Sequence, residues 1–228
     1  MNLHHVRFFE IPSTHKWLME NVALLRASGH QDILVSTEKQ TAGIGRQGNC
    51  WYQTEHALAF SFTIAPDAVP TLTPLEIGVL LAQYFKEKFR IQLKLKWPND
   101  LLDESLGKCG GIISQYVDDR CVVVGVGLNL YRGALDARIA LDYPMGYVSA
   151  HAISVDVEDL TQYLLTHRLV EVAPQWMTYS AHQGLQVRIA DGEMTWSGKF
   201  TGLGQNGEAV LDNDGKIQLI SAGQLRIS

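Results

Sequence analysis

The chain has 228 residues, 46% of them hydrophobic, and a formal net charge of −5 at pH 7. This length can hold one large domain or two unequal ones with a sizeable core. The acidic balance argues against a broad nucleic-acid-binding face. The cysteines Cys50, Cys109 and Cys121 have no Cys-x-x-Cys spacing, which opposes a zinc ribbon and a disulfide framework and suits reduced thiols in the cytosol.

The sequence carries no export or membrane signal. Its N-terminus lacks an apolar signal-peptide segment, and no stretch approaches the roughly 18 apolar residues of a membrane span. We therefore expect a soluble, cytoplasmic protein.

The first predicted elements are a strand, a helix and two further strands. Residues 7–11 form a short strand, and Ser13 or Thr14 can cap a helix with apolar residues at i, i+4 and i+7 spacing. Residues 32–37 and 58–64 read as buried strands. As caps, Ser13 and Thr14 need no further function.

A glycine-rich segment, residues 41–51, joins those two strands and contains three glycines and Arg46. Glycines let the backbone approach a phosphate, and an arginine supplies the matching charge. An isolated Gly-x-Gly is otherwise typical of a plain surface turn. Because a strand follows rather than a helix, the segment is not a dinucleotide-binding motif, and the chain has no P-loop sequence.

The middle of the chain predicts a second helix and a strand. Thr73-Pro74-Leu75-Glu76 reads as a capping box for a helix over residues 73–89. Residues 91–97 alternate as a strand that ends at Pro98. Asn99 and Asp100 therefore follow a strand terminus, where side chains often face a ligand, although this sequence also suits an ordinary turn.

A hairpin is predicted next, with one strand entering at Lys108 and the other over residues 121–129. Its glycines, including Gly111 and Gly127, lower strand propensity, which indicates close packing against that face. By position alone Lys108 could be a solvated edge residue.

The last third predicts a loop over residues 131–153 and a helix over 157–172 that ends before Pro174. Beyond residue 184, Asp-Gly and Asn-Gly turns separate short strands, the pattern of a small barrel. We expect a large domain over residues 1–183 and a small β-barrel domain over 184–228.

Five motifs in this order resemble the biotin protein ligases, also called biotin–[acetyl-CoA-carboxylase] ligases. They are Ser13-Thr14, Gln40-Thr41-Ala42-Gly43-x-Gly45-Arg46-x-Gly48-x-x-Trp51, Lys96-Trp97-Pro98-Asn99-Asp100, Lys108-x-x-Gly111-Ile112 and Gly125-x-Gly127-x-Asn129. The resemblance implies an α/β (α+β) fold, in which a mixed sheet flanked by helices precedes an SH3-like barrel. It makes residues 1–183 the catalytic domain that binds biotin and ATP, and residues 184–228 the barrel. It also implies activation of biotin by MgATP to biotinyl-5′-AMP, then transfer to one lysine of a biotin carboxyl carrier protein.

The resemblance further implies roles for individual residues. Catalysis is expected from Lys108, Arg46 and Asp100, with Asp100 orienting the reacting centre or a Mg²⁺ ion. Trp51 is expected to pack against adenine, and Ser13, Thr14 and Gln40 to bond the ureido head of biotin. The biotin set comprises Ser13, Thr14, Gln40, Gly43, Gly45, Arg46, Lys108 and Gly111. The ATP set comprises Arg46, Trp51, Lys96, Asn99, Asp100, Lys108 and Asn129.

The chain departs from the family pattern at three positions. Ile44 and Gln47 stand where the family loop has arginines, and His15 stands where asparagine usually follows Ser-Thr. The few residues before Val6 leave no room for the helix-turn-helix of the relatives that repress transcription. We expect no DNA or membrane partner, and an exposed strand edge would allow a homodimer.

Two alternatives stay open. One is a lipoate or octanoate ligase or transferase of the related fold, which the Lys96–Asp100 string and the Gly-Arg loop disfavour. The other is a non-catalytic sensor of biotin or nucleotide, which would not need Arg46, Asp100 and Lys108 together.

Overall fold

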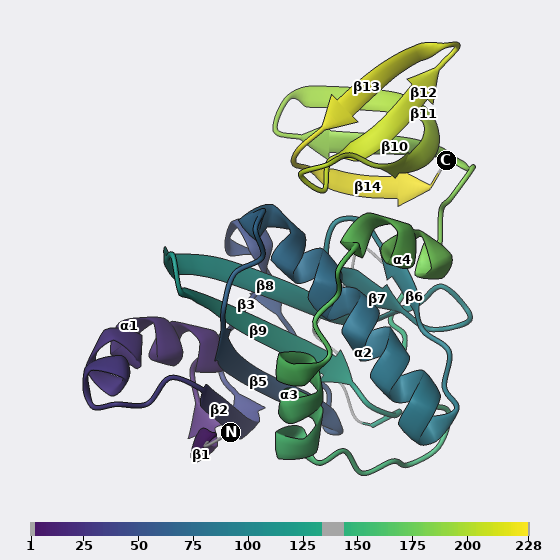
Figure 1. The fold of residues 1–228 in the computed structure, drawn as a ribbon. Coiled ribbons are helices and arrows are strands. Elements are labelled where there is room, and N and C mark those ends of the chain that lie inside the picture. Colours follow the sequence, from purple (N-terminus) through teal and green to yellow (C-terminus); the bar gives the residue numbers. More distant parts are fainter. Residues whose placement is uncertain (1–2, 134–143, 228) are drawn as a thin grey trace.

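The computed structural model describes residues 3–133 and 144–227. Its main feature is a seven-stranded mixed sheet with strand order β1-β2-β5-β9-β8-β7-β6 (Figure 1). β1 and β2 are parallel, and every other neighbouring pair is antiparallel. The strands are β1 (His4–Ile11), β2 (Ile33–Gln40), β5 (Ala57–Ile64), β6 (Lys94–Lys96), β7 (Asp100–Leu102), β8 (Lys108–Asp118) and β9 (Cys121–Asn129).

Helices cover the two faces of this sheet unequally. α1 (Thr14–Ala27) packs Leu18 and Val22 against Ile33 and Val35 of β2. Leu34, which points to the opposite face, belongs instead to the large core under α2 (Thr73–Phe89) and α3 (Val157–Thr166). Figure 1 shows α2 and α3 crossing that face. The period-2 pattern of β2 therefore separates two hydrophobic layers.

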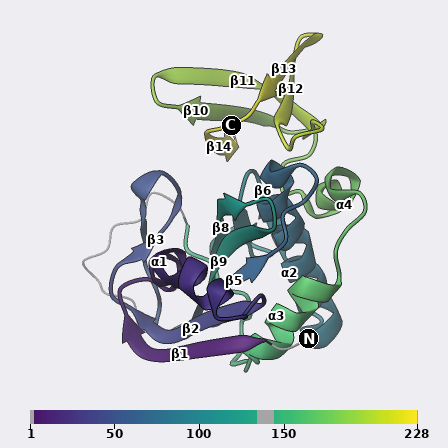
Figure 2. The same ribbon diagram turned by 60° about the vertical axis from the view of Figure 1, so that its left-hand side comes forward.

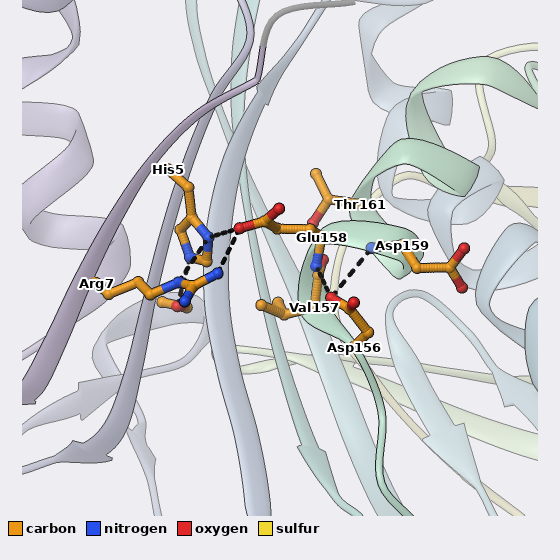
Figure 3. Close-up of polar contacts among 8 residues, drawn as sticks. His5, Arg7, Asp156, Val157, Glu158, Asp159 and Thr161 are labelled. Carbon is orange, nitrogen blue, oxygen red and sulfur yellow. Dashed lines mark hydrogen bonds and ion pairs between the residues drawn. The ribbon is translucent and has the colours of Figure 1, made fainter.

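The N-terminal edge strand is tied to α3 by polar contacts (Figure 3). His5 Nδ1 lies 2.7 Å from Glu158 Oε1, and His5 Nε2 lies 2.7 Å from Ser36 Oγ. Arg7 also contacts Glu158. Asp156 caps α3 by accepting from the backbone N–H of Glu158.

The glycine-rich segment is more regular than the predicted loop. β3 (Gly43–Ile44) and β4 (Cys50–Trp51) pair as a short hairpin around a 3₁₀ turn, η1 (Arg46–Gly48). Gln47 in this turn has φ 54° and ψ 30°, a left-handed conformation. We call residues 43–51 the glycine hairpin.

The predicted capping box of α2 is wrong, although the helix has the expected bounds. Glu76 does not return to the N-terminus, because its buried carboxylate accepts from Arg168 Nε and from the Leu169 backbone N–H. Thr73 Oγ1 has no hydrogen-bond partner among the described residues. A second 3₁₀ turn, η2 (Pro70–Leu72), leads into the helix.

Several other predicted bounds also differ: β1 begins three residues before the strand predicted over residues 7–11, and β2 runs to Gln40, beyond the strand predicted over residues 32–37. The strand predicted over residues 91–97 is limited to Lys94–Lys96, because its partner β7 has only three residues with which to pair. The helix predicted over residues 157–172 ends at Thr166, and α4 (Val172–Tyr179) follows. Pro174 lies in the first turn of α4, where its missing N–H is not needed. Of the loop predicted over residues 131–153, residues 134–143 lie outside the described residues.

The C-terminal strands form a separate five-stranded antiparallel sheet, which fits the predicted SH3-like barrel. They are β10 (Gln186–Asp191), β11 (Met194–Leu203), β12 (Ala209–Asn213), β13 (Lys216–Ile220) and β14 (Gln224–Ile227), in the order β13-β12-β11-β10-β14. Gly192, Gly207 and Gly215 all have positive φ at the predicted turns. The domain division at residues 183 and 184 stays a prediction.

Two hydrogen bonds hold the barrel to segments beside the main sheet, namely η2 and the residue that follows β6. Trp97 Nε1 donates to the Gly207 carbonyl oxygen at 2.9 Å, and Thr71 Oγ1 donates to the Asn206 carbonyl oxygen at 2.7 Å. Within residues 3–133 and 144–227, no helix combines the length and apolar character needed to cross a bilayer.

Candidate active site

A pocket of about 870 Å³ opens on the α1 face of the sheet, beneath the glycine hairpin and beside β14. Predicted site residues from the first four motifs line this pocket. From the fifth motif Gly125 and Gly127 line it, but Asn129 does not. All predicted site residues except Gly43 and Asn129 line it: Ser13, Thr14, Gln40, Gly45, Arg46, Trp51, Lys96, Asn99, Asp100, Lys108 and Gly111.

Cross-strand register places four pocket residues in one row. Lys96 pairs with Asp100, Asp100 with Gly111, and Gly111 with Gly127. Residues directly opposite one another in a ladder point to the same face. The two glycines therefore form a floor without side chains beside a charged edge.

Asp100 is the centre of that charged edge. Its Oδ2 lies 2.8 Å from Lys96 Nζ, and its Oδ1 lies 2.6 Å from Lys108 Nζ. Burial alone would raise the pKa of Asp100, but the ammonium groups of Lys108 and Lys96 outweigh burial and hold the pKa below its ordinary value. The carboxylate is thus ionised and presents two lysines to the pocket.

Lys108 is anchored through its backbone. Its N–H donates to the Pro144 carbonyl oxygen at 2.8 Å, and its carbonyl oxygen accepts from Gly146 N–H at 2.9 Å. A β-bulge between the pairings of Leu101 and Leu102 interrupts the alternation of β7 and β8 next to this lysine. Such bulges re-aim side chains, which accounts for the reach of Lys108 to Asp100.

The opposite end of the pocket is polar but uncharged. Ser13 caps α1 by accepting from Lys16 N–H at 3.3 Å. The Thr14 backbone N–H donates to Gln40 Oε1 at 2.9 Å, and Thr14 Oγ1 lies 2.9 Å from Ser61 Oγ. This end could match a ligand head that both donates and accepts hydrogen bonds.

Trp51 lies over the glycine floor. A Cβ added at Gly127 would lie 2.6 Å from Trp51 Cε2, and one at Gly43 would lie 2.7 Å from the Trp51 carbonyl oxygen. Gly43 therefore permits the close pairing of β3 and β4 rather than lining the pocket. The indole N–H has no hydrogen-bond partner among the described residues.

Arg46 reaches from the hairpin to Asn99, the residue before Asp100. Its Nη1 lies 3.4 Å from Asn99 Oδ1, at the long end of the hydrogen-bond range. Burial lowers the pKa of Arg46, and the carboxylates of Asp100 and Asp191 oppose that effect. The guanidinium thus faces a site where an anion could replace Asn99.

Asn129 lies beside the pocket rather than in its wall. It is buried, and its Oδ1 accepts from Thr54 Oγ1 at 3.2 Å. Its nucleotide-binding role stays a prediction. Sequence reasoning missed Ser61 and the contribution of residues 223–227, which line the pocket from the barrel. Ser61 occupies an ordinary strand position, and the barrel residues reach the site only through docking, so no local signal was available.

The contacts of Asp100 bear on the predicted Mg²⁺ site. Both carboxylate oxygens are engaged by ammonium groups, so this carboxylate does not fit the role of a magnesium ligand. Among the described residues, no group of three or more His, Cys, Asp or Glu side chains could hold a metal ion.

The model of the biotin/lipoate A/B protein ligase family matches residues 9–129. The chain belongs to this family. It is similar to the bifunctional ligase/repressor BirA of Bacillus subtilis, with 25% identity over all of this chain and 75% of that protein. It is also similar to the biotin–[acetyl-CoA-carboxylase] ligase of Mycobacterium tuberculosis, with 28% identity over 89% of this chain and 82% of that protein.

Among solved structures, the biotin protein ligase from Aquifex aeolicus in complex with biotin and ATP has the same fold. The TM-score is 0.78, the identity 24%, and the alignment covers 99% of each chain. The predicted fold class, a mixed sheet flanked by helices with a small C-terminal β-sheet unit, is thus confirmed for this ligase-family member.

Proposed function

We propose that the protein is a biotin protein ligase. It would join biotin and ATP to form biotinyl-5′-AMP and pyrophosphate, then transfer the biotinyl group to a lysine of a biotin carboxyl carrier protein. The main support for this proposal is the polarity of the pocket. One end is neutral and polar, with Thr14, Gln40 and Ser61, and the other end is cationic, with Lys96 and Lys108. This separation suits a ligand with an uncharged polar head and an anionic tail. The names of the similar proteins support the same activity.

The first step would form a bond between a biotin carboxylate oxygen and the α-phosphorus of ATP, and pyrophosphate would leave. Both reactants are anions. Lys108 and Arg46, placed between them, would reduce the repulsion and stabilise the charge that develops at the phosphate. Lys96 would extend the positive charge toward the nucleotide. Magnesium supplied with ATP would neutralise the phosphate tail.

The second step would need no nucleophile from the enzyme. The neutral amine of the acceptor lysine would attack the acyl carbon of the mixed anhydride, AMP would leave, and the amine would lose a proton to solvent. The role of this chain would be to hold the adenylate against water until the acceptor arrives. A cytoplasmic location, a homodimer and the carrier protein as partner belong to this proposal.

Pyrophosphate release measured with biotin, lipoate and octanoate in turn tests the proposal. We expect release with biotin and ATP alone, followed by labelling of an added biotin carboxyl carrier domain. Greater release with lipoate or octanoate would identify a ligase for that acid instead. Biotin binding without pyrophosphate release would identify a sensor.

A further inference from the structure

The tip of the glycine hairpin is held to the C-terminal barrel. Gln47 Nε2 donates to Asp191 Oδ1 at 3.2 Å, and Asp191 is the last residue of β10. In Figure 2 the end of the barrel where β10 turns into β11 lies above the loop beyond β3. The two residues are 144 positions apart in sequence, so their contact depends on the docking of the barrel over the pocket.

Little else holds this tip in place. Ile44 and residues 47–50 are exposed, so burial contributes little to its order. Among the described residues, the other hydrogen bond from residues 46–49 to a residue outside the glycine hairpin is the long one from Arg46 Nη1 to Asn99 Oδ1. A phosphate would draw Arg46 away from Asn99, because a bond between two ions is stronger than one to a neutral amide. The contact between Gln47 and Asp191 does not depend on that exchange.

The backbone conformation of Gln47 and the charge of Asp191 also support a role for this contact. Gln47 has a left-handed backbone conformation, which is unfavourable for a residue other than glycine unless surrounding contacts support it. The Asp191 carboxylate also acts on Arg46, where it opposes the effect of burial on the guanidinium. One barrel residue thus influences both side chains at the tip of the hairpin.

We propose that Asp191 is a positioning residue for this active site. Acting through Gln47, it holds the tip of the glycine hairpin, residues 46–49, over the pocket before any ligand binds and prolongs retention of the adenylate. A hairpin ordered in advance loses less conformational freedom on binding, so the ligand is held more tightly. The part that concerns the adenylate rests on the proposed function, whereas the ordering of the free hairpin does not.

Hydrogen–deuterium exchange of the ligand-free protein tests the ordering directly. In Asp191→Ala, the amides of residues 44–50 should exchange roughly two- to fivefold faster, the range for one exposed polar contact, and the rest of the main sheet should be unchanged. Gln47→Ala should give the same increase. The double variant should exchange no faster than either single variant, because both remove one shared contact. Unchanged exchange in Asp191→Ala would overturn the proposal.

Glu193→Ala is the matched control, since Glu193 is an exposed acid in the same turn. It removes an equal charge and should leave hairpin exchange at the wild-type rate. An equal effect from Glu193→Ala would mean that the charge of the turn, and not the contact with Gln47, orders the hairpin, which would also reject the proposal.

Retention of the adenylate is a second measurement. Dissociation of biotinyl-5′-AMP from Asp191→Ala should be roughly two- to fivefold faster than from wild type, with a smaller change in the rate of adenylation at saturating substrates. If wild type forms no adenylate, the proposed function fails, while the exchange experiment still decides the role of Asp191. If wild type forms adenylate and the variant releases it at the wild-type rate, the effect on retention is refuted.

Discussion

The indole of Trp51 rests directly on the backbone of Gly127, where an added Cβ would lie 2.6 Å from Trp51 Cε2. The contact explains why a glycine interrupts the valine-rich strand β9. It also joins the glycine hairpin to the floor of the pocket. Any side chain at position 127 must displace either the ring or the strand.

Gly127→Ala should therefore weaken nucleotide binding. Real Cβ atoms do not approach other atoms this closely, so Trp51 must move, and overpacking of this kind costs roughly 1–3 kcal/mol. If Trp51 packs on adenine, the KM for ATP should rise about tenfold while the Kd for biotin changes little. Gly202→Ala is the control, because a Cβ there meets nothing within 4 Å. An unaltered KM for ATP in Gly127→Ala would show that Trp51 does not contact the nucleotide.

Lys108→Ala should slow adenylation by roughly a hundredfold, the effect of losing one preorganised donor at a developing charge. Transfer from purified biotinyl-5′-AMP should be affected less, because no two anions approach each other in that step. Rapid-quench measurement of both half-reactions checks this. A normal adenylation rate would remove Lys108 from catalysis.

Lys96→Ala is the matched variant for that experiment. Both lysine side chains are 21% exposed and each forms an ion pair with Asp100, so the losses of folding stability should be similar. Lys96→Ala should act mainly on the KM for ATP. A similar loss of stability combined with different kinetics would assign the chemistry to Lys108 and not to the ion pair.

Substitutions at Ser13 should distinguish its capping role from its predicted biotin contact. Ser13→Ala removes the side chain that accepts from Lys16 N–H and should lower the free energy of unfolding by about 1 kcal/mol. Ser13→Asp should restore the cap, because a carboxylate is a good helix N-cap. It cannot donate a hydrogen bond, so biotin affinity should stay low. Urea unfolding measures the stability of both variants, and calorimetric titration measures their affinity for biotin. Full biotin affinity in Ser13→Asp would show that Ser13 caps α1 and does not contact biotin.

Acid should destabilise the fold partly through His182. This residue is fully buried and packs edge-on against Trp176 and Phe200, and neither ring nitrogen has a hydrogen-bond partner among the described residues. Burial, assisted by the charge of Lys96, lowers its pKa from 6.5 to about 3. The unfolded chain therefore binds a proton that the folded chain does not, and stability falls as the pH drops below about 6.5.

For His182 this loss amounts to about 2 kcal/mol between pH 7 and pH 5. The free energy of unfolding, measured with urea, should fall between pH 7 and pH 5 in both proteins. In His182→Leu this fall should be smaller than in wild type by about 2 kcal/mol. His15, whose burial lowers its pKa to about 4, should still contribute to the variant's acid sensitivity. An equal pH dependence in wild type and His182→Leu would show that position 182 is not the source.

Most of the elements follow from local patterns. The alternation in residues 58–64, the apolar face of residues 73–89 and the Asp-Gly and Asn-Gly turns each depend on neighbours within a few positions, and each element was predicted close to its observed bounds. The motifs likewise identified the family, and all of the site residues predicted from them except Gly43 and Asn129 line the pocket.

The errors arose where a distant residue competed with a local one. Glu76 has the spacing of a capping box, but Arg168, 92 positions away, binds its carboxylate instead. Residues 91–93 alternate like a strand, yet β7 is too short to pair with them. Local sequence cannot report which of two partners is nearer in space.

Sequence by itself determined the family, the two sheets and the residue types at the site. Tertiary structure alone decided that Lys96, Asp100, Gly111 and Gly127 form one row, because strand register and a bulge set which side chains share a face. It also decided that Asp191 reaches Gln47, because barrel docking sets that distance. Both outcomes depend on contacts between segments far apart in the chain, and such contacts leave no periodic signal in the sequence around either partner.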